Sequence, residues 1–475
     1  MLDDTIAAIA TPLGEGGLAV IRLSGPQALS VADKCFTPAG SKSLKPSAAE
    51  SHTIHFGRIV RHGATVDEVL VAVMRAPRTF TREDVVEITC HGGILPAKTV
   101  LDAVLESGAR PAEPGEFTRR AFLNGRIDLA QAEAVADLIH SRTELALRAA
   151  NEQLAGKLSQ RINLLRDELM KTLAHLEAHI DFPDEDIAPD TRTRLLARLE
   201  QGVAFMDQLL QTANEGQILR RGIRAAIVGR PNAGKSSLLN QLLGHGRAIV
   251  SSIPGTTRDT IEETANIRGL PVVFIDTAGL REAQNEIEVE GIRRSRQSLE
   301  KAELVLHVFD ISEPLTRADE DTLAEFPEKK RILVRNKMDL PARLELPDQA
   351  GQSRQGGKHG PERAGNIPPG RPVVDVCCLT GNGIERLKDV IREVVWSGEI
   401  KAEMLEAMVN SRHQDALNRA RVAARRTIGA LQANHTLELA AMELRIAVNA
   451  VGEIVGKTAT EDLLDMIFSQ FCIGK

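Results

Sequence analysis

The sequence predicts a multidomain protein with an α+β N-terminal domain, a helical bundle domain and an inserted Ras-like α/β P-loop domain. Three observations lead to this fold class: a phosphate-loop pattern at 229–236, helical spacing of apolar residues over 154–180, and short alternating runs with glycine-rich turns before residue 120. We expect the domains to cover 1–120, then 121–215 together with 400–475, and 216–399. A chain of 475 residues is long enough for about three domains.

The N-terminal part alternates apolar and polar residues in short runs, as half-buried strands do. The runs at 18–23 and 84–88 are examples, and glycine clusters at 14–17 and 92–93 supply turns. This pattern predicts an α+β domain.

The next part carries leucine and isoleucine at steps of 4, 4, 3, 4, 4, 3 and 4 from 154 to 180, which is the period of a helix face. The pattern stops at Pro183, so we expect a packed bundle rather than an extended coiled coil. The chain becomes helical again over 403–431 and 437–456, and Thr458 with Glu461 has the spacing of a capping box for a last helix. The α/β domain thus interrupts a helical domain, and a nucleotide-driven change in it would act on both connections to the bundle.

The α/β domain opens with the pattern G-x-x-x-x-G-K-[ST] at 229–236, after an apolar run at 223–228 and before an apparent helix. In this arrangement backbone N–H groups wrap phosphates, Lys235 neutralises charge on the β and γ phosphates, and the Ser236 hydroxyl ligates magnesium. We therefore expect the nucleotide to contact Asn232, Ala233, Gly234, Lys235, Ser236 and Ser237.

Two later motifs select the base. The run 272–275 ends in Asp276, Thr277, Ala278 and Gly279, which suits a strand that delivers an acidic residue near magnesium and a glycine near the γ-phosphate. The run 332–334 leads to Asn336, Lys337 and Asp339, where a carboxylate at a strand end can accept both N–H donors of guanine. Adenine lacks that donor pair, so the sequence predicts a GTP-binding enzyme.

Composition narrows the class further. The five cysteines are odd in number and lack paired metal-ligand spacing, which argues against disulfides and structural zinc. A formal net charge of −6 argues against broad electrostatic binding of nucleic acid. The start lacks a basic leader region and no apolar run reaches membrane-span length, so we expect a cytoplasmic protein without membrane contact.

The glycine- and proline-rich stretch 341–372 is expected to be a disordered surface loop.

Taken together, the motifs resemble those of the MnmE (TrmE) tRNA-modification GTPase family over nearly the whole chain. Beyond the GTPase motifs, the resemblance rests on five blocks that are specific in combination: 10–17, 114–124, 128–134, 180–185 and the ending Phe471-Cys472-Ile473-Gly474-Lys475.

The resemblance implies a reaction and partners. Such proteins form homodimers and act with the flavoprotein MnmG (GidA), which carries the FAD, on the wobble uridine of certain tRNAs. They add an aminomethyl or carboxymethylaminomethyl group to carbon 5, using a one-carbon unit from 5,10-methylene- or 5-formyl-tetrahydrofolate. The family's folate-binding positions match Arg22, Glu87, Arg126 and Lys475, and Cys472 matches its candidate catalytic cysteine. A thiolate at Cys472 would be a nucleophile, although inert burial suits a lone cysteine equally well.

The resemblance also supplies a hydrolysis mechanism. Ras-type GTPases place a water-orienting glutamine directly after the D-x-x-G motif, and Leu280 occupies that position here. The family uses a glutamate that matches Glu288, whose acidic neighbours would otherwise indicate a solvated helix face. No arginine finger is identifiable, and the family instead binds potassium where negative charge develops.

The family's potassium ligands match Asn232, Ser251, Ile253 and Thr256, and its second magnesium ligand matches Thr257. The whole switch loop is expected to contact GTP: Ser251, Ser252, Ile253, Pro254, Gly255, Thr256 and Thr257. One departure is Cys377-Cys378, which stands where the family tends toward Ser-Ala in the last guanine-contacting loop. A backbone N–H there would contact the guanine, so cysteine need not abolish binding.

An alternative class is a GTPase switch or an RNP or ribosome assembly factor without covalent RNA chemistry. Arg412, Arg419 and Arg426 recur every seven residues and would line one helix face, either as phosphate contacts or as a solvated charge stripe. The folate-site matches and the 471–475 ending favour the modification enzyme.

Overall fold

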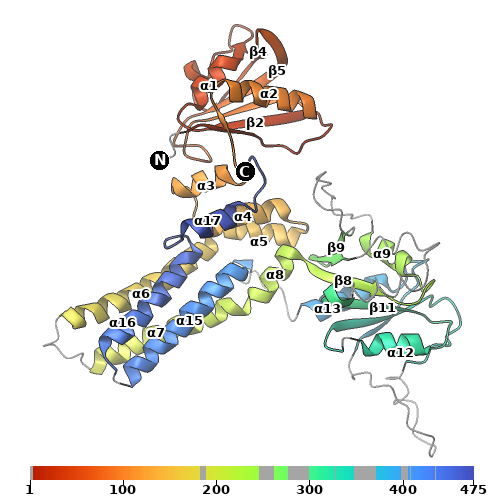
Figure 1. Ribbon diagram of the computed structural model, residues 1–475. Coiled ribbons are helices and arrows are strands. Elements are labelled where there is room, and N and C mark those ends of the chain that lie inside the picture. Colours follow the sequence, from red (N-terminus) through yellow and green to blue (C-terminus); the bar gives the residue numbers. More distant parts are fainter. Residues whose placement is uncertain are drawn as a thin grey trace, which may run out of the picture. The chain divides into compact units, whose positions relative to one another are not determined.

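The computed structural model describes residues 4–181, 189–244, 262–275, 299–325, 327–346, 371–396, 405–406, 408–433 and 435–475 (Figure 1). The chain divides into two compact units. The first unit consists of Met1–Ala136, Glu152–Leu210 and Arg412–Lys475, and the second of Asp137–Asn151 and Gln211–Ser411.

The first unit begins with a seven-stranded sheet in the order β3-β4-β5-β6-β2-β1-β7. Alternation builds it: every second residue of β2 and β4 is buried, because successive side chains point to opposite faces. The buried face packs against helices α1 and α2 (Figure 1). The bounds are β1 Ile6–Ile9, β2 Leu18–Ser24, α1 Ala28–Cys35, β3 Phe36–Pro38, β4 Thr53–Arg61, β5 Ala64–Met74, β6 Val85–His91, α2 Ile94–Glu106 and β7 Arg110–Pro111.

The remainder of the first unit is helical. The apolar spacing predicted over 154–180 forms α6, which packs along α16, and the buried positions include Leu158, Ile162, Leu165, Leu169 and Leu173. The helices are α3 Glu116–Leu123, α4 Leu129–His140, α6 Lys157–Asp181, α7 Pro189–Gln211, α15 Ser411–Gln432, α16 Leu437–Ile454 and α17 Glu461–Phe468. The end of α4 and most of α5, Glu144–Leu154, belong to the second unit.

The second unit is a six-stranded sheet in the order β13-β12-β11-β8-β10-β9. All neighbouring pairs run parallel except β10 with β9. Parallel strands place their carboxyl ends at one edge, which is where ligands bind in such sheets. The elements are α8 Ala213–Arg221, β8 Ile223–Val228, α9 Lys235–Leu243, β9 Glu263–Ile267, β10 Leu270–Phe274, β11 Leu304–Asp310, α12 Arg317–Ala324, β12 Lys330–Asn336, β13 Val373–Asp375 and α13 Ile384–Val395.

Three details differ from the sequence expectations. Residues 137–151, expected in the helical domain, belong to the second unit, since Ala146 and Ala149 pack into its core. Thr458 does not cap the last helix: Thr460 accepts from the Leu463 N–H, while the Thr458 hydroxyl donates to the Asn449 carbonyl at 2.7 Å.

The third difference concerns the stretch 341–372, which was expected to be disordered throughout. Its start is ordered, because Leu344 and Leu346 are buried in a small core with Phe309 and Leu333. The Leu344 N–H also donates to the Ile311 carbonyl at 3.1 Å. Positions 347–370 lie outside the described residues.

Candidate nucleotide-binding site

The P-loop joins the end of β8 to the start of α9, as the sequence predicts. It needs backbone conformations that glycine adopts readily, with φ of 147° at Gly229 and 96° at Gly234. Space also demands glycine, since a Cβ on Gly229 would lie 2.2 Å from the Val308 carbonyl oxygen. The loop is therefore fixed closely against β11.

The lysine and serines of the loop stand where phosphates would bind. The ammonium of Lys235 donates to the carbonyls of Gly229 at 2.9 Å and Arg230 at 2.8 Å, so it folds back over the loop. Burial lowers the pKa of Lys235, and an arriving polyphosphate would favour its charged form. Ser236 and Ser237 are exposed in the first turn of α9, whose free N–H groups attract anions.

The base-recognition loop follows β12 and is tied to the P-loop by one buried amide. Asn336 is 3% exposed; its Nδ2 donates to the Ala233 carbonyl at 2.9 Å and its Oδ1 accepts from the Cys378 N–H at 3.1 Å. A Cβ on Gly234 would lie 2.1 Å from the same Nδ2. Asn336 therefore joins three loops, and the exposed carboxylate of Asp339 is left to meet a base.

Lys337 is anchored by an acidic residue at the end of β11. Its Nζ lies 2.5 Å from Asp310 Oδ2, and Ser312 donates to Oδ1 of the same carboxylate at 2.6 Å. Burial alone would raise the pKa of Asp310, but the bonds from Lys337 and Ser312 hold it below its ordinary value. Sequence reasoning missed Asp310, although it ends an apolar run just as Asp276 does.

Cys377 and Cys378, which were matched to the last guanine-contacting loop, make different contacts. Cys377 is 2% exposed, and its thiol donates to Asp339 Oδ1 at an Sγ to O distance of 3.2 Å. Cys378 contributes its main chain, since its carbonyl accepts from Gln241 Nε2 on α9 at 2.8 Å. Burial raises the pKa of Cys378 to about 11, so this thiol stays protonated at neutral pH.

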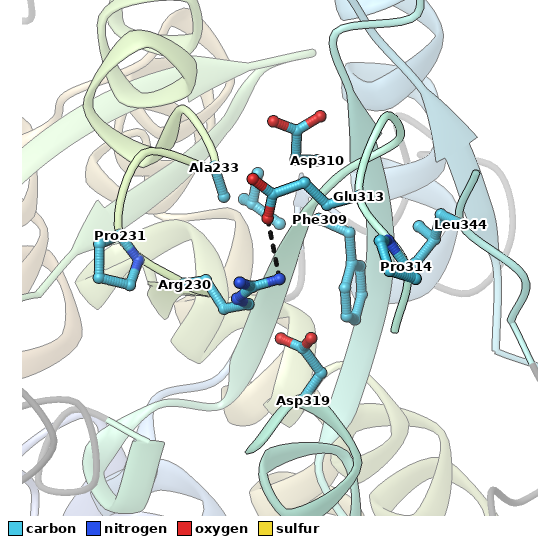
Figure 2. A pocket seen from close by; sticks show the side chains of 10 residues that line it. Arg230, Pro231, Ala233, Phe309, Asp310, Glu313, Pro314, Asp319 and Leu344 are labelled. Atoms are coloured by element: carbon cyan, nitrogen blue, oxygen red, sulfur yellow. Dashed lines mark ion pairs between the residues drawn. The ribbon is translucent and has the colours of Figure 1, made fainter. Parts of the chain in front are cut away.

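A small hollow lies beside the P-loop, between it and the end of β11 (Figure 2). Arg230 reaches across it to Glu313 at 2.9 Å. Asp319, also in its lining, caps α12 through Thr316. These contacts brace the outer side of the P-loop.

Part of the predicted GTP site lies outside the described residues. This applies to the switch loop, the D-x-x-G motif and the candidate catalytic glutamate, namely Ser251, Ser252, Ile253, Pro254, Gly255, Thr256, Thr257, Asp276, Thr277, Ala278, Gly279 and Glu288.

The residues matched to a folate site lie in the first unit. Arg22 on β2 and Glu87 on β6 face each other in register, and Arg22 Nε donates to Glu87 Oε1 at 2.7 Å. Arg22 also donates to the Gly474 carbonyl at 3.3 Å, which brings the C-terminal residues to the pair. Arg126 is held separately: it donates to the Thr79 carbonyl at 3.3 Å and lies 5.1 Å from the Phe80 ring centroid.

The C-terminal segment, residues 471–475, is seated on the sheet domain. The Cys472 carbonyl accepts from the Gly115 N–H at 3.4 Å, and a Cβ on Gly474 would lie 2.6 Å from the Ile9 carbonyl oxygen. Cys472 itself is exposed, and Lys475 is half-buried. The structure thus brings Arg22, Glu87 and the C-terminal segment together.

The arginine stripe on α15 is engaged within the protein. Arg412 pairs with Glu133 at 2.8 Å and Arg419 with Glu453 at 2.6 Å, while Arg426 lies 3.8 Å from Glu443. Pairing with carboxylates reduces the charge that these side chains offer to phosphates.

A parallel sheet whose carboxyl edge carries a P-loop and an Asn-Lys-x-Asp loop defines a P-loop protein with a guanine-type base site. Family comparisons agree with this class. Residues 5–126 match the "GTP-binding protein TrmE N-terminus" and residues 129–472 match the "MnmE helical domain". The chain belongs to the MnmE family of tRNA modification GTPases, which confirms both the predicted resemblance and the predicted GTPase.

The relatives match along their whole length. The tRNA modification GTPase MnmE of Geobacillus kaustophilus is 47% identical over 99% of this chain and 99% of its own. The Bacillus subtilis protein of the same name is 44% identical over 99% of this chain and 100% of its own. Among solved structures, the G domain of the T. maritima FeoB iron transporter is 26% identical over 37% of this chain and 99% of its own, with a TM-score of 0.25. Within the described residues, no helix is long and apolar enough to cross a membrane.

Proposed function

We propose that this protein is a potassium-activated GTPase that acts with the flavoprotein MnmG on the wobble uridine of certain tRNAs. In this reaction it helps add an aminomethyl or carboxymethylaminomethyl group to carbon 5, with a tetrahydrofolate derivative as one-carbon donor. The observation that carries the proposal is the seating of the C-terminal segment beside Arg22 and Glu87. A GTPase switch alone does not need this ion pair to hold a segment that carries an exposed cysteine.

The GTP site fits its ligand. The P-loop offers free N–H groups at the start of α9, and the Asn336 bridge leaves Asp339 free to accept the two N–H donors of guanine. Magnesium would be held by Ser236 and Thr257, and potassium by Asn232, Ser251, Ile253 and Thr256. A bound potassium would supply positive charge where the γ-phosphate develops negative charge. Glu288 would orient the attacking water.

The folate site also fits its ligand. Arg22 is a fixed guanidinium of the kind that pairs with carboxylates of a folate tail, and Glu87 both orients it and offers acceptor oxygens to ring N–H groups. Lys475 would add a second cation, and Arg126 a third from the segment that carries Phe80. Cys472, exposed beside this group, is the proposed nucleophile.

The test is nucleoside mass spectrometry of tRNA from cells that lack this protein and carry either the wild-type gene or a variant. We expect the wild type to restore the modified wobble uridine and Arg22→Ala to lose it with GTP hydrolysis intact. Arg58→Ala is the matched control, since Arg58 forms an exposed pair with Glu68 on the same sheet. Full modification without the protein, in cells with no second enzyme, would favour the alternative of a switch or an assembly factor.

A further inference from the structure

A buried carboxylate in the first unit takes no part in the chemistry proposed above. Glu133 on α4 is 5% exposed and accepts two bonds from one guanidinium, from Arg412 Nε at 2.9 Å and from Arg412 Nη2 at 2.8 Å. His413 Nε2 lies 2.8 Å from the same carboxylate. Burial alone would raise the pKa of Glu133, but these neighbours hold it well below its ordinary value. We refer to Glu133, Arg412 and His413 as the junction cluster.

The guanidinium of Arg412 also reaches a third helix. Nη1 donates to the Glu453 carbonyl at 2.8 Å and Nη2 to the Ile454 carbonyl at 2.9 Å. These are the last carbonyls of α16, beyond the reach of the regular helical bonds, and the Glu453 carbonyl also accepts from the Gly456 N–H at 3.2 Å. One side chain therefore fixes the start of α15, the middle of α4 and the end of α16.

The junction cluster lies next to two places where the chain passes between the units. The first unit is left after Ala136, one helical turn beyond Glu133, and it is re-entered at Arg412 itself. At these two connections, a change in the second unit would reach the first unit within a few residues of the cluster.

From the end of α16 the contacts continue to the C-terminal segment. The Val455 carbonyl accepts from the Leu129 N–H at 3.4 Å. Gly456, with φ of 82°, has room for no Cβ because the Phe122 ring lies 2.7 Å from that position. The turn after α16 is thereby held against α3 and α4.

The last helix is held in the same way. Arg119 on α3 pairs with Glu461 at 2.9 Å and Asp465 at 2.8 Å, both on α17. A Cβ on Gly115 would lie 2.6 Å from the Phe468 carbonyl oxygen, at the end of α17. The C-terminal segment follows directly and ends at the Arg22 pair.

We propose that Arg412 is a positioning residue for tRNA modification, which transmits the state of the GTPase unit through the end of α16 and α17 to the C-terminal segment. This role rests on the proposed function. A guanidinium suits it because its rigid fork fixes the relative direction of two partners, which an aliphatic side chain of similar volume does not. Stability alone is a weaker reason for the cluster, because apolar replacement of buried ion pairs is often neutral or stabilising.

The experiment measures GTP hydrolysis and nucleoside modification separately, using the full-length protein with MnmG, a tetrahydrofolate one-carbon donor, an amine donor and unmodified tRNA. We expect the double variant Glu133→Leu with Arg412→Met to melt within a few degrees of the wild type and to hydrolyse GTP at a similar rate. Its yield of modified uridine should fall about tenfold, as expected when an interaction used in only one of two activities is lost. Arg412→Lys keeps the positive charge but not the forked guanidinium, so its yield of modified uridine should fall nearly as far.

The matched control is Arg421→Met, on the same helix. Arg421 pairs with Asp207 on α7 at 2.8 Å, a contact that involves neither α4 nor α16. We expect this variant to keep normal modification. The positioning role is overturned if the double variant gives the wild-type yield of modified uridine. It is also overturned if Arg421→Met loses modification to the same extent as the double variant. If the wild type itself modifies nothing, the proposed function fails and the positioning role fails with it.

Discussion

At the scale of single residues, the thiol of Cys377 donates to the carboxylate of Asp339, the side chain that is proposed to recognise guanine. The base would be read by Asp339, which is exposed and otherwise free to rotate, and Cys377 holds one of its oxygens at 3.2 Å. A carboxylate fixed in this way can meet the N1–H and the 2-amino group of guanine together. Inosine lacks the 2-amino group, so it reports whether both contacts are made.

We expect Cys377→Ala to weaken GTP binding about fivefold to tenfold, the value of one ordinary hydrogen bond, because a thiol is a weak donor. Affinity for ITP should change less, so the ratio of the two dissociation constants should shrink. Cys377→Ser should restore the ratio, because a hydroxyl donates to the same oxygen. Cys378→Ala is the control, since that residue contributes only main-chain bonds to this site. Equal weakening of GTP and ITP binding would assign Cys377 a purely structural role.

Asn336 shows where residue-level prediction from sequence ends. Its place in an Asn-Lys-x-Asp motif predicts that it belongs to a base-recognition loop. In the structure, its Nδ2 donates to the P-loop and its Oδ1 accepts from the 377–378 loop. These partners lie 103 and 42 residues away along the chain, and spacing within a motif carries no information about them.

At the scale of elements, α3 is joined to β1 and to the segment before β6 by a network around Arg120, which is fully buried. Arg120 donates to Glu116 Oε1 at 2.9 Å and to Asp4 Oδ1 at 2.6 Å, and Arg110 donates to the same Glu116 oxygen at 2.7 Å. Burial alone would raise the pKa of Glu116, but the bonds from Arg110, the Glu113 N–H and Arg120 hold it below its ordinary value. The pKa of Asp4 is lowered in the same way.

Groups with a lowered pKa stabilise the folded state above their unfolded pKa, and this contribution is lost as the pH falls through the folded value. The network should therefore contribute fully above pH 4.5, the ordinary value for Glu116, and progressively less below it. We expect Glu116→Gln to cost about 2 kcal/mol at pH 7, by loss of charged hydrogen bonds, and much less near pH 3. Thermal unfolding of both proteins across this range measures the difference. Glu68→Gln, in an exposed pair with Arg58, should have little effect at any pH.

Elements near a motif were easier to predict than elements defined by packing. The strand at 223–228 and the strand before Asn336 were predicted because apolar runs end directly in phosphate and base motifs. Residues 137–151 were assigned to the helical domain because their composition is helical, yet their small face, with Ala146 and Ala149, packs in the core of the second unit. Thr458 was predicted to cap α17, but its hydroxyl donates to the Asn449 carbonyl, and Thr460 caps the helix instead. The first outcome depends on residues far away along the chain, and the second on a partner nine residues away.

At the scale of the whole molecule, the folate-matched residues come from both ends of the chain. Arg22 and Gly474 are 452 residues apart and are joined by one hydrogen bond. Periodicity and composition do not predict such a contact, and only the family resemblance placed these residues in one site. The GTPase unit is inserted between them in the sequence, which leaves the helices of the first unit as the covalent route from GTP to the C-terminal segment.

The proposed use of potassium also belongs to the whole molecule, because the family resemblance implies that the GTPase units of two subunits meet at this ion. Asn232 is exposed in the P-loop with φ of 62°, so its amide is available to a cation and its backbone adopts a conformation that asparagine tolerates. A cation placed beside the phosphates would do the work of an arginine finger. We expect GTP turnover at least about tenfold faster in potassium chloride than in sodium chloride, equivalent to ~1.4 kcal/mol of barrier.

The decisive variant is Asn232→Gly, which removes the amide but keeps the backbone conformation accessible. It should bind GTP normally and lose the advantage of potassium over sodium. Asn232→Ala would be harder to interpret, because it removes the amide and also strains the backbone at this positive φ. Equal turnover in the two salts, or a potassium effect that survives in Asn232→Gly, would contradict a potassium site at this residue.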